Sequence, residues 1–175
     1  MKNARIIFFV LFGLVLSGFP LHSENKIVGF EWKDFSDASP KAAKEKKHLV
    51  INFYSTGCGW CKRMDNVTFG DTAIARQLSA SFVGVKINTG SNRPVIWKGQ
   101  TITERELSRT FKVNGTPNTS FVDTSGNIVA AIPGFVPPDK FALVLKYIAG
   151  YWYKDLTFQE FLVSEDALKK QGIGQ

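Results

Sequence analysis

An almost wholly apolar run, His48–Tyr54, is followed after three residues by two cysteines that are themselves two residues apart. The run is rich in β-branched and aromatic residues and lacks polar alternation, which is typical of a central strand covered on both faces. Gly57 ends this strand, and the segment from Gly59 to about residue 66 can form a helix. A cysteine pair at a strand-to-helix turn restricts both the fold and the chemistry of this chain.

Helix-forming and strand-forming segments alternate on both sides of this turn. A helix is expected over residues 39–47, because Ser39 is a cap residue and Pro40 takes the first helical position. A second helix, capped by its first residue, is expected over 71–80, and a strand over 81–88. This alternation predicts a parallel α/β arrangement.

The next part of the chain predicts antiparallel strands. Residues 89–100 contain two glycines and a proline, so we expect a loop insertion with Trp97 exposed. A helix capped by Thr103 follows it. Two strands, over 119–123 and 128–132, are separated by a short turn that contains a glycine, which predicts a hairpin.

The last part of the chain predicts two more helices. One apolar face indicates a helix over 139–149 that packs on the sheet, and Thr157 with Glu160 has the spacing of a capping box. We therefore predict an α/β fold with a central mixed β-sheet flanked by helices, an insertion after the third strand and an extra C-terminal helix. The expected domain covers residues 24–150, and a helical extension covers 151–175.

Residues 1–23 have the pattern of a secretory signal peptide. Lys2 and Arg5 precede an apolar stretch over residues 6–19. That stretch is shorter than the roughly 20 residues that a membrane-spanning helix needs, so cleavage near Ser23 is favoured over a retained anchor. We expect a periplasmic or secreted protein with no stable membrane insertion after signal removal.

The charge of the chain does not indicate a nucleic-acid partner. The formal net charge is +7 and falls to +5 without the signal peptide. Lys41, Lys44, Lys46 and Lys47 lie on a predicted helix that also carries Glu45, and they alternate with alanine rather than with aromatic residues. A solvated helix face is the favoured interpretation of this cluster.

Cys58 and Cys61 have the spacing and setting of a redox-active pair. The first sulfur is expected to face the unpaired amide groups of the first helical turn, which favour a thiolate and lower its pKa from the free value of about 8.5. The spacing places the second sulfur beside the first, where it can resolve a mixed disulfide. Zinc is disfavoured because it would need about two more ligands, and a structural disulfide over so short a loop would gain little stability.

With these residues in view, the chain resembles the thioredoxin-like superfamily over about residues 27–148. Residues 53–62 are similar to the strand, CxxC and lysine segment of the superfamily, residues 115–117 resemble its cis-proline loop, and Gly134 matches its terminal glycine. The signal peptide, Trp60 and the C-terminal tail are most similar to bacterial periplasmic thioredoxin-like proteins of the SoxW type or to the C-terminal domain of DsbD.

The resemblance implies roles for residues around the cysteines. It implies a cis peptide bond before Pro117, with the Thr116 backbone pairing to a substrate strand, whereas the local sequence alone is equally compatible with a trans proline. We expect Trp60 to be exposed and to contact substrate. The chain departs from the family at Asn52, where thioredoxins usually carry an aspartate that helps to deprotonate the second cysteine, because an amide cannot take that proton.

We therefore predict a thiol–disulfide oxidoreductase with Cys58 as nucleophile and Cys61 as resolving thiol, with no metal and no cofactor besides this disulfide. Its partners would be proteins with thiols or disulfides, and the resemblance implies a membrane electron donor of the DsbD type. The dipeptide Gly59-Trp60 lacks the histidine of strongly oxidising members, which favours a reductant. The alternatives are an isomerase, an oxidant or a non-catalytic binding module. No dimerisation domain is visible, so we expect a monomer.

Overall fold

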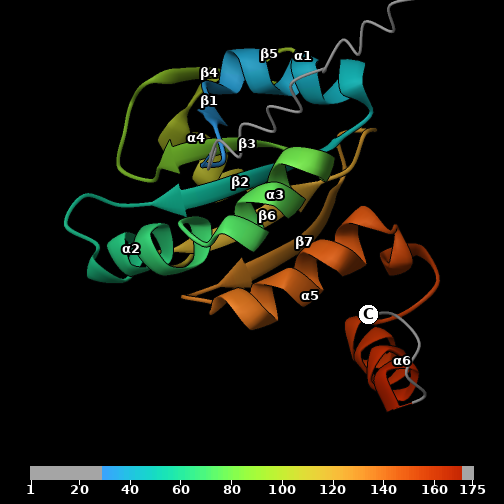
Figure 1. The fold of residues 1–175 in the computed structure, drawn as a ribbon. Helices are drawn as coiled ribbons and strands as arrows, with labels where there is room; N and C mark the ends of the chain where they lie inside the picture. Colours follow the sequence, from blue (N-terminus) through green and yellow to red (C-terminus); the bar gives the residue numbers. More distant parts are fainter. Residues whose placement is uncertain (1–28, 171–175) are drawn as a thin grey trace, which may run out of the picture.

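The computed structural model describes residues 29–170 of the chain (Figure 1). The expected signal peptide, residues 1–23, lies outside the described residues. Between residues 29 and 170, no helix combines the length and the apolar character that crossing a membrane requires.

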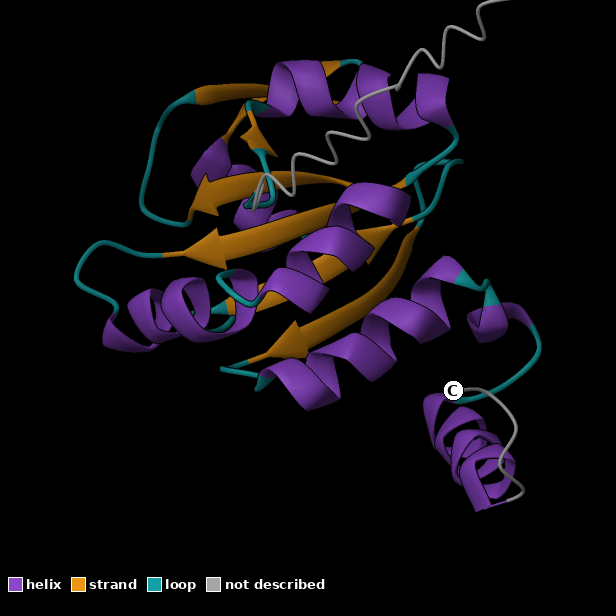
Figure 2. Cartoon of the chain, viewed as in Figure 1, coloured by secondary structure: helices purple, strands orange, loops and turns teal. Residues whose placement is uncertain are grey.

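A mixed sheet forms the centre of the described part of the chain (Figure 2). The strands are β1 (Trp32–Lys33), β2 (His48–Tyr54), β3 (Phe82–Asn88), β4 (Pro94–Trp97), β5 (Gln100–Thr103), β6 (Asn118–Val122) and β7 (Ile128–Pro133). Five of them form the main sheet in the order β1-β3-β2-β6-β7, with β1, β3 and β2 parallel and β6 antiparallel to both β2 and β7. The predicted mixed sheet with a central β2 is confirmed.

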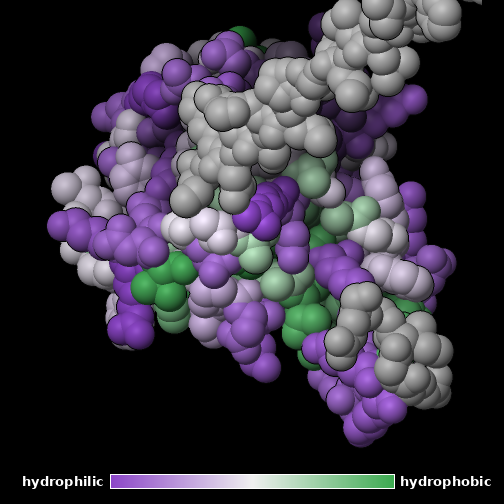
Figure 3. All heavy atoms as spheres, viewed as in Figure 1, coloured by the Kyte–Doolittle hydropathy of each residue, from purple (hydrophilic) through white to green (hydrophobic). Residues whose placement is uncertain are grey.

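Helices cover both faces of this sheet. They are α1 (Phe35–Glu45), α2 (Gly59–Arg63), α3 (Thr72–Ser81), α4 (Glu104–Thr110), α5 (Pro138–Ala149) and α6 (Phe158–Lys170), with a π-helical turn η1 (Met64–Phe69) after α2 and a 3₁₀ turn η2 (Trp152–Lys154) before α6. One core cluster joins α1 and α4 to one face of the sheet, and a second joins η1, α3, α5 and α6 to the other. In the space-filling view, a few apolar patches interrupt a largely hydrophilic surface (Figure 3).

Strand β2 contributes to both core clusters. Leu49, Ile51 and Phe53 pack in the cluster under α1 and α4, whereas Val50 packs in the opposite one. All four side chains are at most 3% exposed. The continuous apolar run therefore reflects burial on both faces, as the sequence predicts.

Helix α1 begins earlier than predicted. Its N-cap is Asp34, and Pro40, expected at the first helical position, lies inside the helix. Phe35, Ala38 and Ala42 are buried and form the apolar stripe that packs on the sheet. The expected start at residue 39 is wrong because tertiary packing of the first turn outweighs the local capping signal.

Residues 89–93 form the expected loop, but the prediction is wrong from residue 94 onward, because β4 and β5 form an antiparallel hairpin there. Lys98 and Gly99, at its turn, both have positive φ, which matches the twist that a two-residue hairpin turn needs. Trp97, expected to be exposed, is partly buried against Phe35 and Phe111. Burial of these aromatic rings holds the hairpin on the α1 and α4 face.

Three predicted helix starts are confirmed in their capping contacts. The Asp71 carboxylate accepts from the backbone N–H groups of the first turn of α3, and Thr103 forms a capping box with Glu106 at α4. Thr157 and Glu160 make the same reciprocal hydrogen bonds before α6, which extends to Lys170. These caps satisfy amide groups that would otherwise lack partners.

Candidate active site

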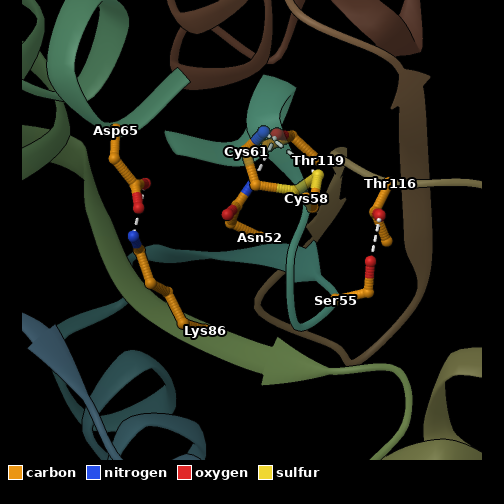
Figure 4. Close-up of a disulfide and its surroundings, with 8 residues drawn as sticks. All are labelled: Asn52, Ser55, Cys58, Cys61, Asp65, Lys86, Thr116 and Thr119. Atoms are coloured by element: carbon orange, nitrogen blue, oxygen red, sulfur yellow. Dashed lines mark hydrogen bonds and ion pairs between the residues drawn. A yellow bond between two sulfur atoms is a disulfide. The ribbon is translucent and has the colours of Figure 1, made fainter. Parts of the chain in front are cut away.

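The two cysteines lie where β2 turns into α2 (Figure 4). Gly57 has a φ of +78°, a conformation that residues with a side chain rarely adopt, and Cys58 follows it as the N-cap of α2. Cys58 and Cys61 are joined by a disulfide with a Cα–Cα distance of 5.3 Å. The turn therefore brings both sulfurs together at the carboxyl end of the central strand.

The two sulfur-bearing residues differ in their surroundings. Cys61 is only 6% exposed, whereas Cys58 is partly exposed. The backbone N–H of Cys61 donates to the Sγ of Cys58 at 3.1 Å. The first sulfur thus faces an amide donor of the first helical turn, as predicted, and this contact favours negative charge on that sulfur.

The loop before β6 lies beside the disulfide. The Thr116–Pro117 peptide bond is cis, the form that the family resemblance implies. The hydroxyl groups of Ser55 and Thr116 are 2.8 Å apart, which joins this loop to the turn after β2. The backbone N–H of Gly134 donates to the Pro117 carbonyl at 2.8 Å. Segments far apart in the sequence therefore meet at the cysteine pair.

Asn52 lies on β2 close to Cys61 (Figure 4). Its side chain is 1% exposed, and its Nδ2 donates to the Thr119 hydroxyl on β6 at 3.2 Å. Thr119 and Asn52 are also direct partners in the β2–β6 register. The position that carries an aspartate in thioredoxins thus holds an amide that is committed to the neighbouring strand and carries no titratable proton.

Asp65 and Lys86 form an ion pair to one side of Asn52 (Figure 4). Lys86 stands opposite Asn52 in the β2–β3 register, and its ammonium group lies 5.2 Å from the centre of the Trp32 ring. Asp65 lies on η1, one turn after Cys61. The sequence offered no signal for this pair, because its two members meet only through the sheet register and the π-helical turn.

Trp60 is 58% exposed, which confirms the expected exposure. Its ring centre nevertheless lies 5.8 Å from that of Phe135, in the segment after β7. The Arg63 guanidinium lies 5.5 Å from the Trp60 ring centre and 5.2 Å from that of Phe135. Sequence reasoning missed Arg63 and Phe135, because nothing local indicates that the β7–α5 connection reaches α2.

The arrangement suits thiol–disulfide exchange. An accessible sulfur at a helix N-terminus can attack a disulfide, and a buried sulfur next to it can complete the exchange. Within residues 29–170, no cluster of three or more histidine, cysteine, aspartate or glutamate side chains could hold a metal ion.

The predicted insertion after the third strand contains the β4–β5 hairpin. This hairpin packs against α1 and α4, on the opposite face of the sheet from η1.

Comparison with known proteins supports this interpretation. Residues 35–149 match the thioredoxin-like domain family. The thiol:disulfide interchange protein DsbD of Vibrio vulnificus (strain CMCP6) is 34% identical over 97 residues, which cover 54% of this chain and 15% of that protein. Human spermatogenesis-associated protein 20 is 33% identical over 67 residues, covering 38% of this chain and 8% of that protein. The chain therefore spans a small part of each relative.

Solved structures agree on the fold. A thioredoxin-fold protein from Helicobacter pylori has a TM-score of 0.61 at 20% identity, covering 69% of this chain and 80% of its own. A thioredoxin from Thermus thermophilus has a TM-score of 0.58 at 24% identity, covering 69% and 88%. The DsbH oxidoreductase has a TM-score of 0.53 at 20% identity, covering 76% and 94%. The match over residues 35–149, together with the fold that these structures share, shows that the chain belongs to the thioredoxin-like domain family.

Proposed function

We propose that this protein reduces disulfides of protein substrates in the periplasm, with Cys58 as the nucleophile and Cys61 as the resolving thiol. The observation that carries the proposal is the unequal exposure of the two residues that share the disulfide. A substrate sulfur can approach Cys58, whereas Cys61 is covered by its own domain. The order of attack follows from this difference.

The proposed reaction transfers two electrons and two protons to the substrate. In the reduced protein, the Cys58 thiolate attacks one sulfur of the substrate disulfide, that disulfide breaks, and the departing sulfur takes up a proton. Cys61 then loses its proton and attacks the Sγ of Cys58, which breaks the mixed disulfide and releases the second substrate thiol. The product on the protein is the Cys58–Cys61 disulfide present in the structure.

The proposed substrate-binding residues are Trp60, Thr116 and Pro117. Within residues 29–170, the Thr116 backbone N–H and C=O make no hydrogen bond to other backbone groups, so both are free to pair with an extended substrate segment. Pro117 is buried, and the exposed ring of Trp60, which lies between the two cysteines in the sequence, offers an apolar contact to a substrate.

The direction and location of the reaction rest on sequence features. The secretory pattern of residues 1–23 supports export, after which the chain would act as a periplasmic monomer over residues 24–175. The absence of a histidine between the cysteines supports a reducing potential. An oxidised reductant needs a source of electrons in that compartment, and the similarity to DsbD supports a membrane electron donor of that type.

The order of attack is tested by trapping the mixed disulfide. Cys61→Ala retains the nucleophile but cannot resolve, so it should accumulate a covalent complex with a disulfide substrate. Cys58→Ser should form no complex and should lose reduction of insulin. Non-reducing electrophoresis and mass spectrometry identify the linked cysteine. A stable complex through Cys61 in the Cys58→Ser protein would contradict the proposal.

A further inference from the structure

A cation held by two aromatic rings lies beside the reactive cysteines. Arg63 is on the last turn of α2, three residues after Trp60, so the two side chains project from the same side of the helix. Phe135 reaches the same place from the connection between β7 and α5, and the Arg63 guanidinium lies within 5.5 Å of both ring centres. We call Trp60, Arg63 and Phe135 the Arg63 platform.

The platform is anchored to the site on both sides. Gly134, immediately before Phe135, is hydrogen-bonded to the Pro117 carbonyl. Val136, immediately after it, accepts a 2.6 Å hydrogen bond from the buried Thr68 hydroxyl on η1. Phe135 is therefore fixed between the proline loop and the helical segment that follows the cysteines, so the platform is in place before a partner binds.

Arg63 retains its capacity to bind an anion. A guanidinium packed on aromatic rings keeps N–H groups free in its own plane, and these match the two oxygens of a carboxylate. Among residues 29–170, Arg63 takes part in no ion pair, and neither does its exposed neighbour Lys62. The carboxylate of Asp65, on the following turn, is bound to Lys86. Helix α2, which begins after Cys58, therefore carries two positive charges that form no ion pair within residues 29–170.

We infer that Arg63 determines substrate specificity by binding an aspartate or glutamate side chain that lies near the reactive cysteine of the partner protein. This inference rests on the proposed function and adds the chemistry of the partner. A partner segment that pairs with Thr116 and presents its sulfur to Cys58 passes the platform, where Arg63 receives the carboxylate and the two rings contact the adjoining apolar atoms. The substrates are thus proteins whose redox-active cysteine has an acidic neighbour.

The test compares three disulfide-linked peptides that are identical except for one residue near the cysteine, which is glutamate, glutamine or lysine. The measured quantity is the ratio of kcat/KM for the glutamate peptide to that for the glutamine peptide. The wild-type protein should prefer glutamate by about tenfold, the size expected for a charge-assisted hydrogen bond. Arg63→Gln should bring the ratio to about one, and Arg63→Glu should favour the lysine peptide.

Lys62→Gln is the matched control, because it removes a neighbouring exposed charge that forms no cation–π contact with either ring of the platform. Its ratio should stay within about twofold of the wild-type value. Equal rates for the three peptides in the wild-type protein, or an unchanged ratio in Arg63→Gln, would overturn the inference and leave the reductase proposal standing. A wild-type protein that reduces none of the peptides would overturn both.

Discussion

The two ends of strand β2 are built in opposite ways. At its carboxyl end, the chain turns through Gly57 into a partly exposed Cys58. At its amino end, His48 is 2% exposed, its Nε2 lies 3.1 Å from the Tyr153 hydroxyl, and its ring centre lies 4.6 Å from that of Tyr151. Phe82, on the neighbouring strand β3, packs against the His48 ring in the same aromatic cluster.

This difference places the residues of the proposed reaction at one end of β2 and the residues that stabilise the fold at the other end. In the proposed reaction a partner sulfur must reach Cys58, and at this end of the strand Cys58 is partly exposed and Trp60 is exposed. The amino end lies at the other end of β2 from the disulfide and is packed with aromatic rings from β3 and from the segment after α5. Substitutions at the packed end should therefore change the free energy of unfolding, and substitutions at the open end should change the exchange reaction.

The largest difference in the free energy of unfolding is expected between Phe82→Ala and Trp60→Ala. Phe82 is 2% exposed and contacts both His48 and Phe121, so its removal should lower the free energy of unfolding by about 3 kcal/mol or more. Trp60 is 58% exposed, so its removal should change stability by less than about 0.5 kcal/mol. Urea denaturation of the two oxidised variants measures both values.

The order of the two variants should be reversed when the measured quantity is kcat/KM for disulfide reduction. Trp60→Ala should lower kcat/KM for protein disulfides, whereas Phe82→Ala should leave it near the wild-type value at a temperature where the variant is folded. Insulin reduction provides the measurement. Equal kinetic losses in the two variants would show that the two ends of β2 are not separate in function.

A smaller effect is expected from Asn52→Asp, which places a carboxyl group under the disulfide. Asn52 is buried and donates to Thr119, and the neighbouring Lys86 on β3 is already paired with Asp65. A carboxylate at this position would therefore lose its water without gaining an unpaired cation. We expect a destabilisation of about 1–3 kcal/mol at neutral pH. Burial would raise the pKa of this carboxyl, so the folded state would bind its proton more tightly than the unfolded state. The destabilisation should therefore grow as the pH rises through that pKa.

Urea denaturation of Asn52→Asp and of the wild-type protein at pH 5 and pH 8 tests this dependence. The difference in stability between the two proteins should be larger at pH 8. A difference that stays constant, or that is larger at pH 5, would mean that the introduced carboxyl is solvated and that the site beneath the disulfide is more open than its burial indicates.

The smallest expected change in the free energy of unfolding is the one that follows protonation of His48. Burial lowers the pKa of His48, the Lys154 charge lowers it further, and the Asp123 charge opposes both. The unfolded state therefore takes up this proton more readily than the folded state, so the stabilising contribution of the neutral ring is present above pH of about 6.5 and declines as the pH falls below it. His48→Gln should flatten the dependence of unfolding free energy on pH in this range.

Thermal or urea unfolding at intervals from pH 5 to pH 8 provides the comparison. The exchange reaction serves as the internal control, because His48 lies at the end of β2 remote from the disulfide. A wild-type stability that rises as the pH falls below 6.5 would contradict the assignment of a neutral, buried His48.

Sequence reasoning succeeded where the signal is local. Asp71 and Thr103 cap helices through contacts within three residues, and the apolar run of β2 directly reports burial on two faces. It failed where contacts between residues far apart in the sequence determine the local structure or the burial of a side chain. Trp97 is partly buried because Phe35 and Phe111 lie across from it, and α1 starts early because its first turn packs on the sheet.

The candidate site divides in the same way. Cys58, Cys61 and the exposed Trp60 could be identified from the residues around them. Arg63 and Phe135 could not, because they are brought together only when the β7–α5 connection folds back on α2. Local patterns thus identify the cysteines that we propose to react, and the groups that we propose to select a partner appear only in the folded chain.

The most direct test of the account is the site of alkylation in the fully reduced protein. Brief treatment with limiting iodoacetamide at mildly acidic pH, followed by peptide mass spectrometry, measures the relative reactivity of the two thiols. Exposure and the amide contact predict that Cys58 is modified faster than Cys61 by about tenfold or more. Modification of Cys61 at an equal or greater rate would contradict the assignment of Cys58 as the attacking sulfur.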